Sequence, residues 1–251
     1  MNEVMFVGAG PGDPELITVK GQGIVNEADL IIYAGSLVPL AVIDSRKEEC
    51  IVQNSAGMTL DEVVESISEA WKAGKKVARV HTGDPSIYGA IREQMDALDA
   101  VGIPYKVIPG VSSFLASAAA LKKEYTLPGV SQTVICTRLE GRTPVPEKEG
   151  LELLASHQAS MAIFLSVHMI DDVVKRLSVH YSKDTPVAVV QRASWPDEIK
   201  VIGSLENISE LVKAAGITKT AQILVGHFLE GPYELSKLYD PTFSHEYREA
   251  K

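Results

Sequence analysis

Apolar residues recur along this chain in two spacings, one typical of strands and one typical of helices. Short apolar runs bounded by glycine, proline or charged residues indicate buried strands. These runs cover residues 5–7, 29–34, 76–81, 105–110, 133–137, 161–166, 186–191, 198–204 and 222–228. Helical spacing fits segments 59–75, 91–102, 168–180 and 206–216. Strands that alternate with helices predict an α/β fold with mostly parallel or mixed sheets.

This alternation is interrupted once and then restarts. Segment 109–129 contains a run of small residues at 116–120, which predicts a tightly packed helix rather than low complexity. A chain of 251 residues is long enough for two domains of modest size. We therefore expect two α/β domains, the first at 1–118 and the second at 119–251.

Composition and charge narrow the function classes. Apolar residues make up 45% of the chain and charged residues 23%, as in ordinary globular proteins. The formal charge of −9 argues against nucleic-acid binding, which needs clustered lysine and arginine. Cys50 and Cys136 form no C-x-x-C pair, the histidines lack metal-binding spacing, and no signal peptide or long apolar span is evident. We expect a reduced, cytoplasmic protein without a metal site or a membrane partner.

The stretch FVGAGPGDPELITVKG at 6–21 raises the question of a dinucleotide site. Such a site needs G-x-G-x-x-G leading into a helix, and an acidic residue about 20 positions later. Here the glycines are spaced G-x-G-x-G, two prolines interrupt the loop, and Tyr33 and Ala34 stand where the acid is needed. These departures disfavour a nucleotide-binding oxidoreductase. Asp13 and Pro14 predict that a helix starts directly after the loop.

Two further strand-to-helix junctions share the design of the first loop. The Gly-Asp-Pro of 12–14 recurs at 83–85, again after a strand, and a third junction at 109–113 has Gly110 and a candidate cap at Ser112. Each junction alone is explained by a well-made turn with a capping side chain. Because the carboxyl ends of parallel strands share one edge of a sheet, three such junctions together favour a small-molecule site at that edge.

Several motifs, in order along nearly the whole chain, resemble the tetrapyrrole (corrin and porphyrin) methylases, which use S-adenosyl-L-methionine. The motifs are GAGPGDPELITVKG, YAGSLV, HTGDPSIYGA, PGVSS, QTVICTRLEGRTPVPE and ASWPDE. YAGSLV and TRLEGRTPVP are similar to the members that methylate precorrin-4 at C11, and HTGDPSIYG with EGRTPVP to the cobalt-containing branch. The resemblance implies two α/β domains with the cofactor in a crevice between them, and a homodimer. Apolar Val38, Leu40 and Val42 are candidates for the dimer contact.

The resemblance also implies the site residues. Carried over motif by motif, the cofactor contacts are Pro11, Gly83, Asp84, Ile87, Ser112, Ser113, Leu165, Ala193 and Ala221. The substrate of such an enzyme carries many carboxylates, and we expect Arg138, Arg142 and Arg192 to bind them. For the first two arginines the competing interpretation is a solvated loop paired to Glu140 or Glu147.

Methyl transfer from a sulfonium needs alignment more than charge stabilisation, because charge is lost as the transition state forms. No nucleophile elbow and no activated cysteine is present, so we expect no covalent catalytic residue. Asp84 is the one weak candidate for catalysis, as an acceptor of a proton released from the macrocycle, and a plain helix cap is its alternative. The other function classes left open are a metal-free precorrin-4 methyltransferase, a methylase acting on another precorrin or uroporphyrinogen carbon, and a non-catalytic tetrapyrrole carrier.

Overall fold

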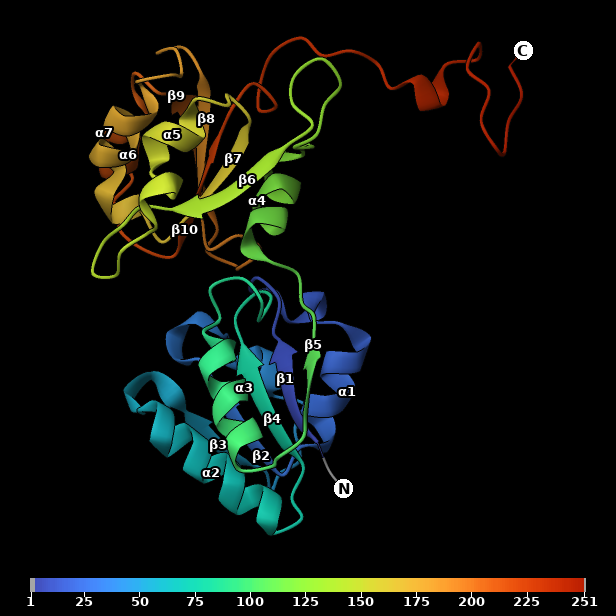
Figure 1. The fold of residues 1–251 in the computed structure, drawn as a ribbon, viewed down its shortest axis with the longest axis vertical. Coiled ribbons are helices and arrows are strands. Elements are labelled where there is room, and N and C mark those ends of the chain that lie inside the picture. The colour runs from blue at the N-terminus through green and yellow to red at the C-terminus, as the bar shows by residue number, and fades with distance from the viewer. Residues whose placement is uncertain (1–2, 251) are drawn as a thin grey trace. The chain divides into compact units, whose positions relative to one another are not determined.

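The computed structural model describes residues 3–250 and divides into two compact units (Figure 1). The first unit runs to Ala116 and also includes Arg192–Glu198; the second comprises Ser117–Gln191 and the chain from Ile199 on. The division falls within helix α4 (Ser113–Leu121). The domain boundary expected after residue 118 stays a prediction.

The first unit is built on a five-stranded sheet in which every strand pairing is parallel. Its order is β3-β2-β4-β1-β5. The strands are β1 (Val4–Gly8), β2 (Leu30–Tyr33), β3 (Ile51–Asn54), β4 (Val77–His81) and β5 (Tyr105–Ile108). Since all five run the same way, the loops that follow β1, β4 and β5 emerge at one edge.

Helices cover both faces of this sheet, as a parallel sheet requires (Figure 1). On one face α1 (Val19–Glu27) contributes Val25 to an apolar cluster with Val7 of β1. On the other face α2 (Leu60–Lys72) and α3 (Ile91–Ala100) pack against Phe6 of β1. Helix α2 begins with a complete capping box, in which Thr59 caps Glu62 and the Glu62 carboxylate accepts the Thr59 N–H.

The second unit is built on a five-stranded mixed sheet of order β6-β7-β10-β8-β9. Only β6 and β7 pair in parallel, and the remaining neighbours are antiparallel. The strands are β6 (Val134–Arg138), β7 (Ser160–Phe164), β8 (Pro186–Gln191), β9 (Ile199–Ser204) and β10 (Ala221–Val225). Together the two units confirm the predicted α/β fold with parallel and mixed sheets.

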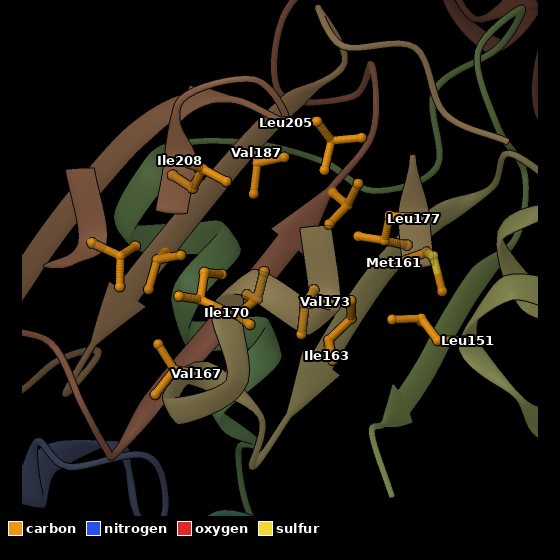
Figure 2. Close-up of a cluster of buried hydrophobic side chains, with 14 of the residues drawn as sticks. Leu151, Met161, Ile163, Val167, Ile170, Val173, Leu177, Val187, Leu205 and Ile208 are labelled. Carbon is orange, nitrogen blue, oxygen red and sulfur yellow. The ribbon is translucent and has the colours of Figure 1, made fainter. Parts of the chain in front are cut away.

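The core of the second unit lies between this sheet and three helices (Figure 2). The helices are α5 (Leu151–Ala155), α6 (Ile170–Leu177) and α7 (Ile208–Ala214). Figure 2 shows Ile163 of β7 and Val187 of β8 in one cluster with Val173 of α6 and Ile208 of α7. Their nearly complete burial makes this cluster the main hydrophobic contribution to the unit.

The helix predicted to start at Asp13 is wrong in its position. Asp13 caps only one 3-10 turn, Pro14–Leu16, and α1 begins at Val19. The reason is a second cap: the Thr18 hydroxyl accepts the Gly21 N–H at 3.0 Å, while Thr18 itself is extended. Strand β3 and the short helix α5 were not predicted.

The apolar residues expected at a dimer contact are mostly internal. Val38 is 3% exposed and Val42 is fully buried, and both belong to the core beside α1. Of these three residues, only Leu40, which is 58% exposed, lies at the surface. Val38 and Val42 were therefore wrong as candidates for a dimer contact, because they pack in the core through the loop that contains the 3-10 turn Leu40–Ile43, whereas Leu40 stays a candidate.

Within residues 3–250, none of the helices combines the length and apolar character needed to span a bilayer.

Candidate active site

The three glycine-containing junctions meet at the carboxyl edge of the parallel sheet. Gly10 and Gly83 exchange both backbone hydrogen bonds, at 3.2 and 2.8 Å, so the loops after β1 and β4 are paired. The third junction is equally close: a Cβ added to Gly110 would lie 2.2 Å from the Gly83 carbonyl oxygen. A Cβ on Gly8 would lie 2.6 Å from the Gly110 nitrogen. The glycines thus allow three backbones to approach each other where side chains have no room.

Asp84 ties the second junction to the third. Its carboxylate accepts the Gly110 N–H at 2.9 Å through one oxygen. The other oxygen accepts the Ser86 N–H at 2.8 Å and the Ser86 hydroxyl. No α-helix begins at Asp84, because the next helix starts at Ile91. The interpretation of Asp84 as a plain helix cap is therefore wrong: Asp84 fixes a turn and a neighbouring loop.

These contacts determine the ionisation of Asp84. Burial raises the pKa of its carboxyl group, but the hydrogen bonds from the Ser86 hydroxyl, the Gly110 N–H and the Ser86 N–H outweigh burial and hold the pKa below its usual value. A carboxylate that is ionised at neutral pH and occupied by three donors is a poor proton acceptor. The geometry gives Asp84 a positioning role.

A segment from late in the chain closes over the first loop. The indole Nε1 of Trp195 donates to the Pro11 carbonyl at 2.9 Å, and the Ser194 hydroxyl accepts the Asp13 N–H at 3.0 Å. The indole fills the space beside Gly12, where a Cβ would lie 2.0 Å from Trp195 Cδ1. All these residues belong to the first unit. We name Arg192–Glu198 the strap.

The strap is held in shape by its own side chains. The Glu198 carboxylate accepts the Ser194 N–H at 2.7 Å. Arg192 pairs with Asp197 and places its guanidinium carbon 5.3 Å from the centre of the Trp195 ring. Both Arg192 and Ser194 have positive φ, at 49° and 70°. Ala193 lies between them and is 6% exposed. The expected substrate arginine, Arg192, is thus engaged with a carboxylate of its own segment.

Sequence reasoning missed Trp195 and Ser194 as site residues. Both lie in the ASWPDE motif at 193–198, for which the resemblance implies only Ala193 as a contact. The expected residues of the three junctions lie as follows. Pro11 is buried in the first loop, Gly83 has φ of 59°, Ile87 is half-buried in the second loop, Ser112 is 5% exposed, and Ser113 begins α4.

In the second unit, the expected residues collect at one end of the mixed sheet. The register pairs Ile223 of β10 with Ile163 of β7, so Ala221 lies at the end of the sheet where Leu165 follows β7. Arg138 ends β6 opposite Phe164, at the same end. Leu165 has φ of 54° and is 62% exposed. Left-handed backbone at a bulky residue costs free energy, and such strain is concentrated at functional positions.

The two loop arginines differ in their surroundings. Arg138 donates to the backbone carbonyls of Leu139, Thr143 and Pro144, at 3.1, 3.2 and 2.8 Å, and so closes its own loop. Arg142 lies exposed near the tip of that loop. Neither arginine pairs with Glu140, which instead forms an ion pair with Arg176 of α6. The competing interpretation of a pair with Glu140 is therefore wrong.

One buried histidine lies next to the second junction. His81 ends β4, is 3% exposed and stacks on Phe6 with ring centroids 5.9 Å apart. Its Nε2 has no hydrogen-bond partner among residues 3–250. Burial, with a smaller contribution from the charge of Arg79, lowers the pKa of His81 to about 3. His81 is neutral under physiological conditions. In the described part of the chain, no group of three or more histidine, cysteine or acidic residues is arranged to hold a metal ion.

Comparison with known proteins decides the family. The model of the tetrapyrrole (corrin/porphyrin) methylases matches residues 3–209. The chain belongs to the tetrapyrrole methylases. It is 58% identical over 250 residues to the cobalt-precorrin-4 C(11)-methyltransferase of Methanocaldococcus jannaschii, with 99% of this chain and 96% of the relative covered. It is 49% identical over 247 residues to the precorrin-4 C(11)-methyltransferase of Pseudomonas aeruginosa, with 98% of each covered.

Solved structures of tetrapyrrole methylases have the same fold. A cobalt precorrin-4 methyltransferase, a cobalamin biosynthetic enzyme, superposes with a TM-score of 0.89 at 46% identity, covering 91% of this chain and 96% of its own. The uroporphyrin-III C-methyltransferase of Thermus thermophilus, solved with S-adenosylhomocysteine, superposes with a TM-score of 0.75 at 25% identity and covers 91% and 94%. This tetrapyrrole methylase is thus an enzyme of the methyltransferase class.

Proposed function

We propose that this chain transfers the methyl group of S-adenosyl-L-methionine to C11 of cobalt-precorrin-4 and releases S-adenosylhomocysteine. In this reaction the sulfur–methyl bond breaks as a carbon–carbon bond forms, and the sulfonium loses its positive charge. The observation that carries the proposal is the 58% identity over nearly the whole length of a relative named for this activity. The meeting of three strand-to-helix junctions at one edge of the parallel sheet supports it, because ligands of open α/β sheets bind at that edge.

The residues proposed to hold the cofactor suit that task. At Gly83 a positive φ turns the backbone, and Ser112 and Ser113 lie next to it: a Cβ on Gly83 would be 3.5 Å from Ser112 Cα. The Pro11 carbonyl accepts the Trp195 indole N–H, which fixes the position of Pro11 in the first loop. When bound, the cofactor supplies the electrophilic methyl group. Pro11, Gly83, Asp84, Ile87, Ser112, Ser113, Leu165, Ala193 and Ala221 are the proposed cofactor-binding residues.

For the substrate, we propose Arg142 as a ligand of a peripheral carboxylate. It is exposed and has no partner among the described residues, and charge-assisted hydrogen bonds to carboxylates are strong. Arg138 and Arg192 are proposed as further carboxylate ligands. In the structure Arg138 is hydrogen-bonded to the Pro144 carbonyl and Arg192 is paired with Asp197. No general base is assigned.

Binding experiments separate this function from the alternatives. Calorimetry with S-adenosylmethionine, S-adenosylhomocysteine and NAD⁺ should show binding of the two sulfur compounds without added metal. Binding of NAD⁺ alone would indicate an oxidoreductase, and binding without turnover on any precorrin would indicate a carrier. Turnover of metal-free precorrin-4 in preference to the cobalt form would favour the second candidate function, for which the 49% identical Pseudomonas aeruginosa relative is named.

We also propose a cytoplasmic homodimer, on family resemblance. Light scattering at low micromolar concentration tests the oligomeric state, and a monomeric mass that does not change on concentration would contradict a dimer.

A further inference from the structure

Ser166 is a fully buried serine just beyond the end of β7, at the end of the mixed sheet where Leu165 and Arg138 lie. Its hydroxyl group makes two hydrogen bonds. It accepts the backbone N–H of Leu139 at 2.9 Å and donates to the carbonyl of Phe164 at 2.7 Å. The first bond joins residues 27 positions apart, one after β7 and the other after β6. One side chain therefore ties two loops of the second unit together.

This hydroxyl group takes the place of a strand partner. The parallel register of β6 and β7 ends at the pair formed by Arg138 and Phe164. Leu165 then leaves the strand, because its φ of 54° is left-handed. Within residues 3–250, the acceptor of the Leu139 N–H is the Ser166 hydroxyl and not a backbone carbonyl. Since a buried N–H without an acceptor is costly, the loop after β6 depends on Ser166 for its starting position.

A serine at the start of a helical turn usually has a simpler role. Ser166 directly precedes the 3-10 turn Val167–Met169, where a serine side chain would be expected to cap the turn. Here the side chain makes no capping hydrogen bond. The backbone carbonyl of Ser166 accepts the Met169 N–H at 2.9 Å instead. The hydroxyl group thus holds the neighbouring loop and not its own turn.

Leu139 is the base of the segment 138–144, which we name the arginine loop. The Leu139 side chain is 3% exposed and lies in the core of the second unit, and its carbonyl accepts the Arg138 guanidinium at 3.1 Å. Farther along the loop, Glu140 is paired with Arg176 of α6. Arg142 follows near the tip. The position of its guanidinium is therefore set by the point at which Leu139 is anchored.

We propose that Ser166 is a positioning residue, which couples the cofactor contact Leu165 to the arginine loop that binds the substrate. The inference rests on the proposed function, because that function assigns ligands to both loops. The bond to the Phe164 carbonyl fixes the backbone just before Leu165, and the bond from Leu139 fixes the base of the arginine loop. Because Ser166 is fully buried, it acts through these neighbours and not by touching a ligand.

Ser166→Ala removes both hydrogen bonds. We expect the affinity for S-adenosylhomocysteine, measured by calorimetry, to fall about threefold to tenfold, and KM for the tetrapyrrole to rise by a similar factor. The value of kcat at saturation should change less, as for a loss of binding that is equal in ground and transition states. Hydrogen exchange of the Leu139 amide should be faster in the variant, because its acceptor is gone.

Ser160→Ala is the matched control. Ser160 is the first residue of β7, is 1% exposed, and donates from its hydroxyl group to the Tyr125 carbonyl at 2.7 Å. It is thus an equally buried serine with a distant backbone partner, at the opposite end of the same strand. Both alanine variants should lower the thermal midpoint by similar amounts. Only Ser166→Ala should change ligand binding and the exchange of the Leu139 amide.

Two results would overturn the coupling. The first is a Ser166→Ala variant with the cofactor affinity and the tetrapyrrole KM of Ser160→Ala, which would make the role of Ser166 structural. The second is a change in only one of these two quantities, which would assign Ser166 to one ligand alone. Should Ser166→Ala not fold, Ser166→Cys decides. A thiol is a weak donor and acceptor, so unaltered binding of both ligands in that variant contradicts the proposal.

Failure of the proposed function gives a different result. An unaltered protein that methylates none of the precorrins contradicts the methyl transfer, whatever the variants do. The coupling is then judged by the affinity for S-adenosylhomocysteine and by the exchange of the Leu139 amide. Both must change in Ser166→Ala and not in Ser160→Ala, and any other outcome overturns it.

Discussion

The indole nitrogen of Trp195 donates a 2.9 Å hydrogen bond to the carbonyl of Pro11, a residue 184 positions earlier in the chain. The first loop of this tetrapyrrole methylase is therefore shaped by the strap as well as by its own glycines. Pro11 is a proposed cofactor contact, and the strap itself carries a second one, Ala193, so we expect the shape of the strap to affect cofactor binding. Three of the predictions below follow from this contact and from the Asp84 contacts.

Gly12→Ala should damage the first loop selectively. The new Cβ would overlap the Trp195 ring, and overpacking of this kind costs about 1–3 kcal/mol of unfolding free energy. If the indole is displaced, affinity for S-adenosylhomocysteine should fall about tenfold or more, as measured by calorimetry. Gly23→Ala is the control: Gly23 lies on the exposed side of α1 with nothing within 4 Å of the new Cβ, so that variant should gain about 0.5–1 kcal/mol of unfolding free energy. Equal cofactor affinity in both variants would contradict the positioning role of the strap.

Trp195→Phe removes the hydrogen bond to Pro11 but keeps an aromatic ring beside Gly12. Loss of one hydrogen bond should cost about 0.5–1.5 kcal/mol, seen as a rise of about twofold to tenfold in KM for S-adenosylmethionine. The value of kcat at saturating cofactor should change much less. Steady-state kinetics measures both. A fall in kcat with KM unchanged would mean that Trp195 acts on the chemical step instead.

Asp84→Asn tests whether Asp84 positions loops or transfers a proton. The amide cannot accept from both Gly110 and Ser86 as the carboxylate does, so kcat/KM should fall by about tenfold to a hundredfold through misplaced loops. Since the pKa of Asp84 lies below its usual value, the kcat–pH profile near neutrality should keep its shape in the variant. If the unaltered enzyme shows a pH-dependent change in kcat that is absent in Asp84→Asn, Asp84 acts as a proton acceptor.

His81 should make the protein less stable in acid. Its pKa is about 3 in the folded state and 6.5 when unperturbed, so between these values the unfolded chain binds a proton that the folded chain does not. Stability should therefore fall as pH drops below about 6.5, by up to about 1.4 kcal/mol per pH unit from this group, until the folded-state pKa is reached. Urea unfolding at pH 7, 5.5 and 4.5 measures the slope.

His81→Phe isolates this group, because it keeps the stacking on Phe6 and removes the unpaired Nε2. The variant should have a shallower slope between pH 6.5 and 4.5. Exposed His157 is the control, and His157→Gln should keep the original slope. An unchanged slope in His81→Phe would show that other groups cause the acid sensitivity.

Local signals made part of this structure predictable. The helical spacing of apolar residues over 59–75 predicts α2, and the structure confirms the helix at Leu60–Lys72. The Asp13-Pro14 signal gave a wrong helix start, because Thr18 offered a competing cap four residues from Pro14. Local sequence signals could not predict contacts between residues that are far apart in the chain. Nothing next to Trp195 indicates that it packs on Gly12, and nothing next to Glu140 indicates that it pairs with Arg176.

Arg142→Ala should weaken substrate use while leaving cofactor binding intact. Loss of a charge-assisted hydrogen bond of about 1.5–3 kcal/mol should lower kcat/KM for the tetrapyrrole by roughly one to two orders of magnitude. Arg142→Lys should recover only part, because an ammonium lacks the planar pair of donors. Arg138→Ala should in addition loosen the loop that its guanidinium closes. Normal tetrapyrrole kinetics in both alanine variants would make these arginines loop surface.

The most direct test of the proposed reaction is the fate of a labelled methyl group. Purified protein is incubated with S-adenosylmethionine carrying a ¹³C-methyl group and with cobalt-precorrin-4, metal-free precorrin-4 and uroporphyrinogen III in parallel. NMR then locates the label in each product. We predict that the label appears at C11 of the cobalt-precorrin-4 product, with formation of S-adenosylhomocysteine. Transfer to a different ring carbon, transfer only to another of the three substrates, or cofactor binding with no transfer at all would contradict this assignment.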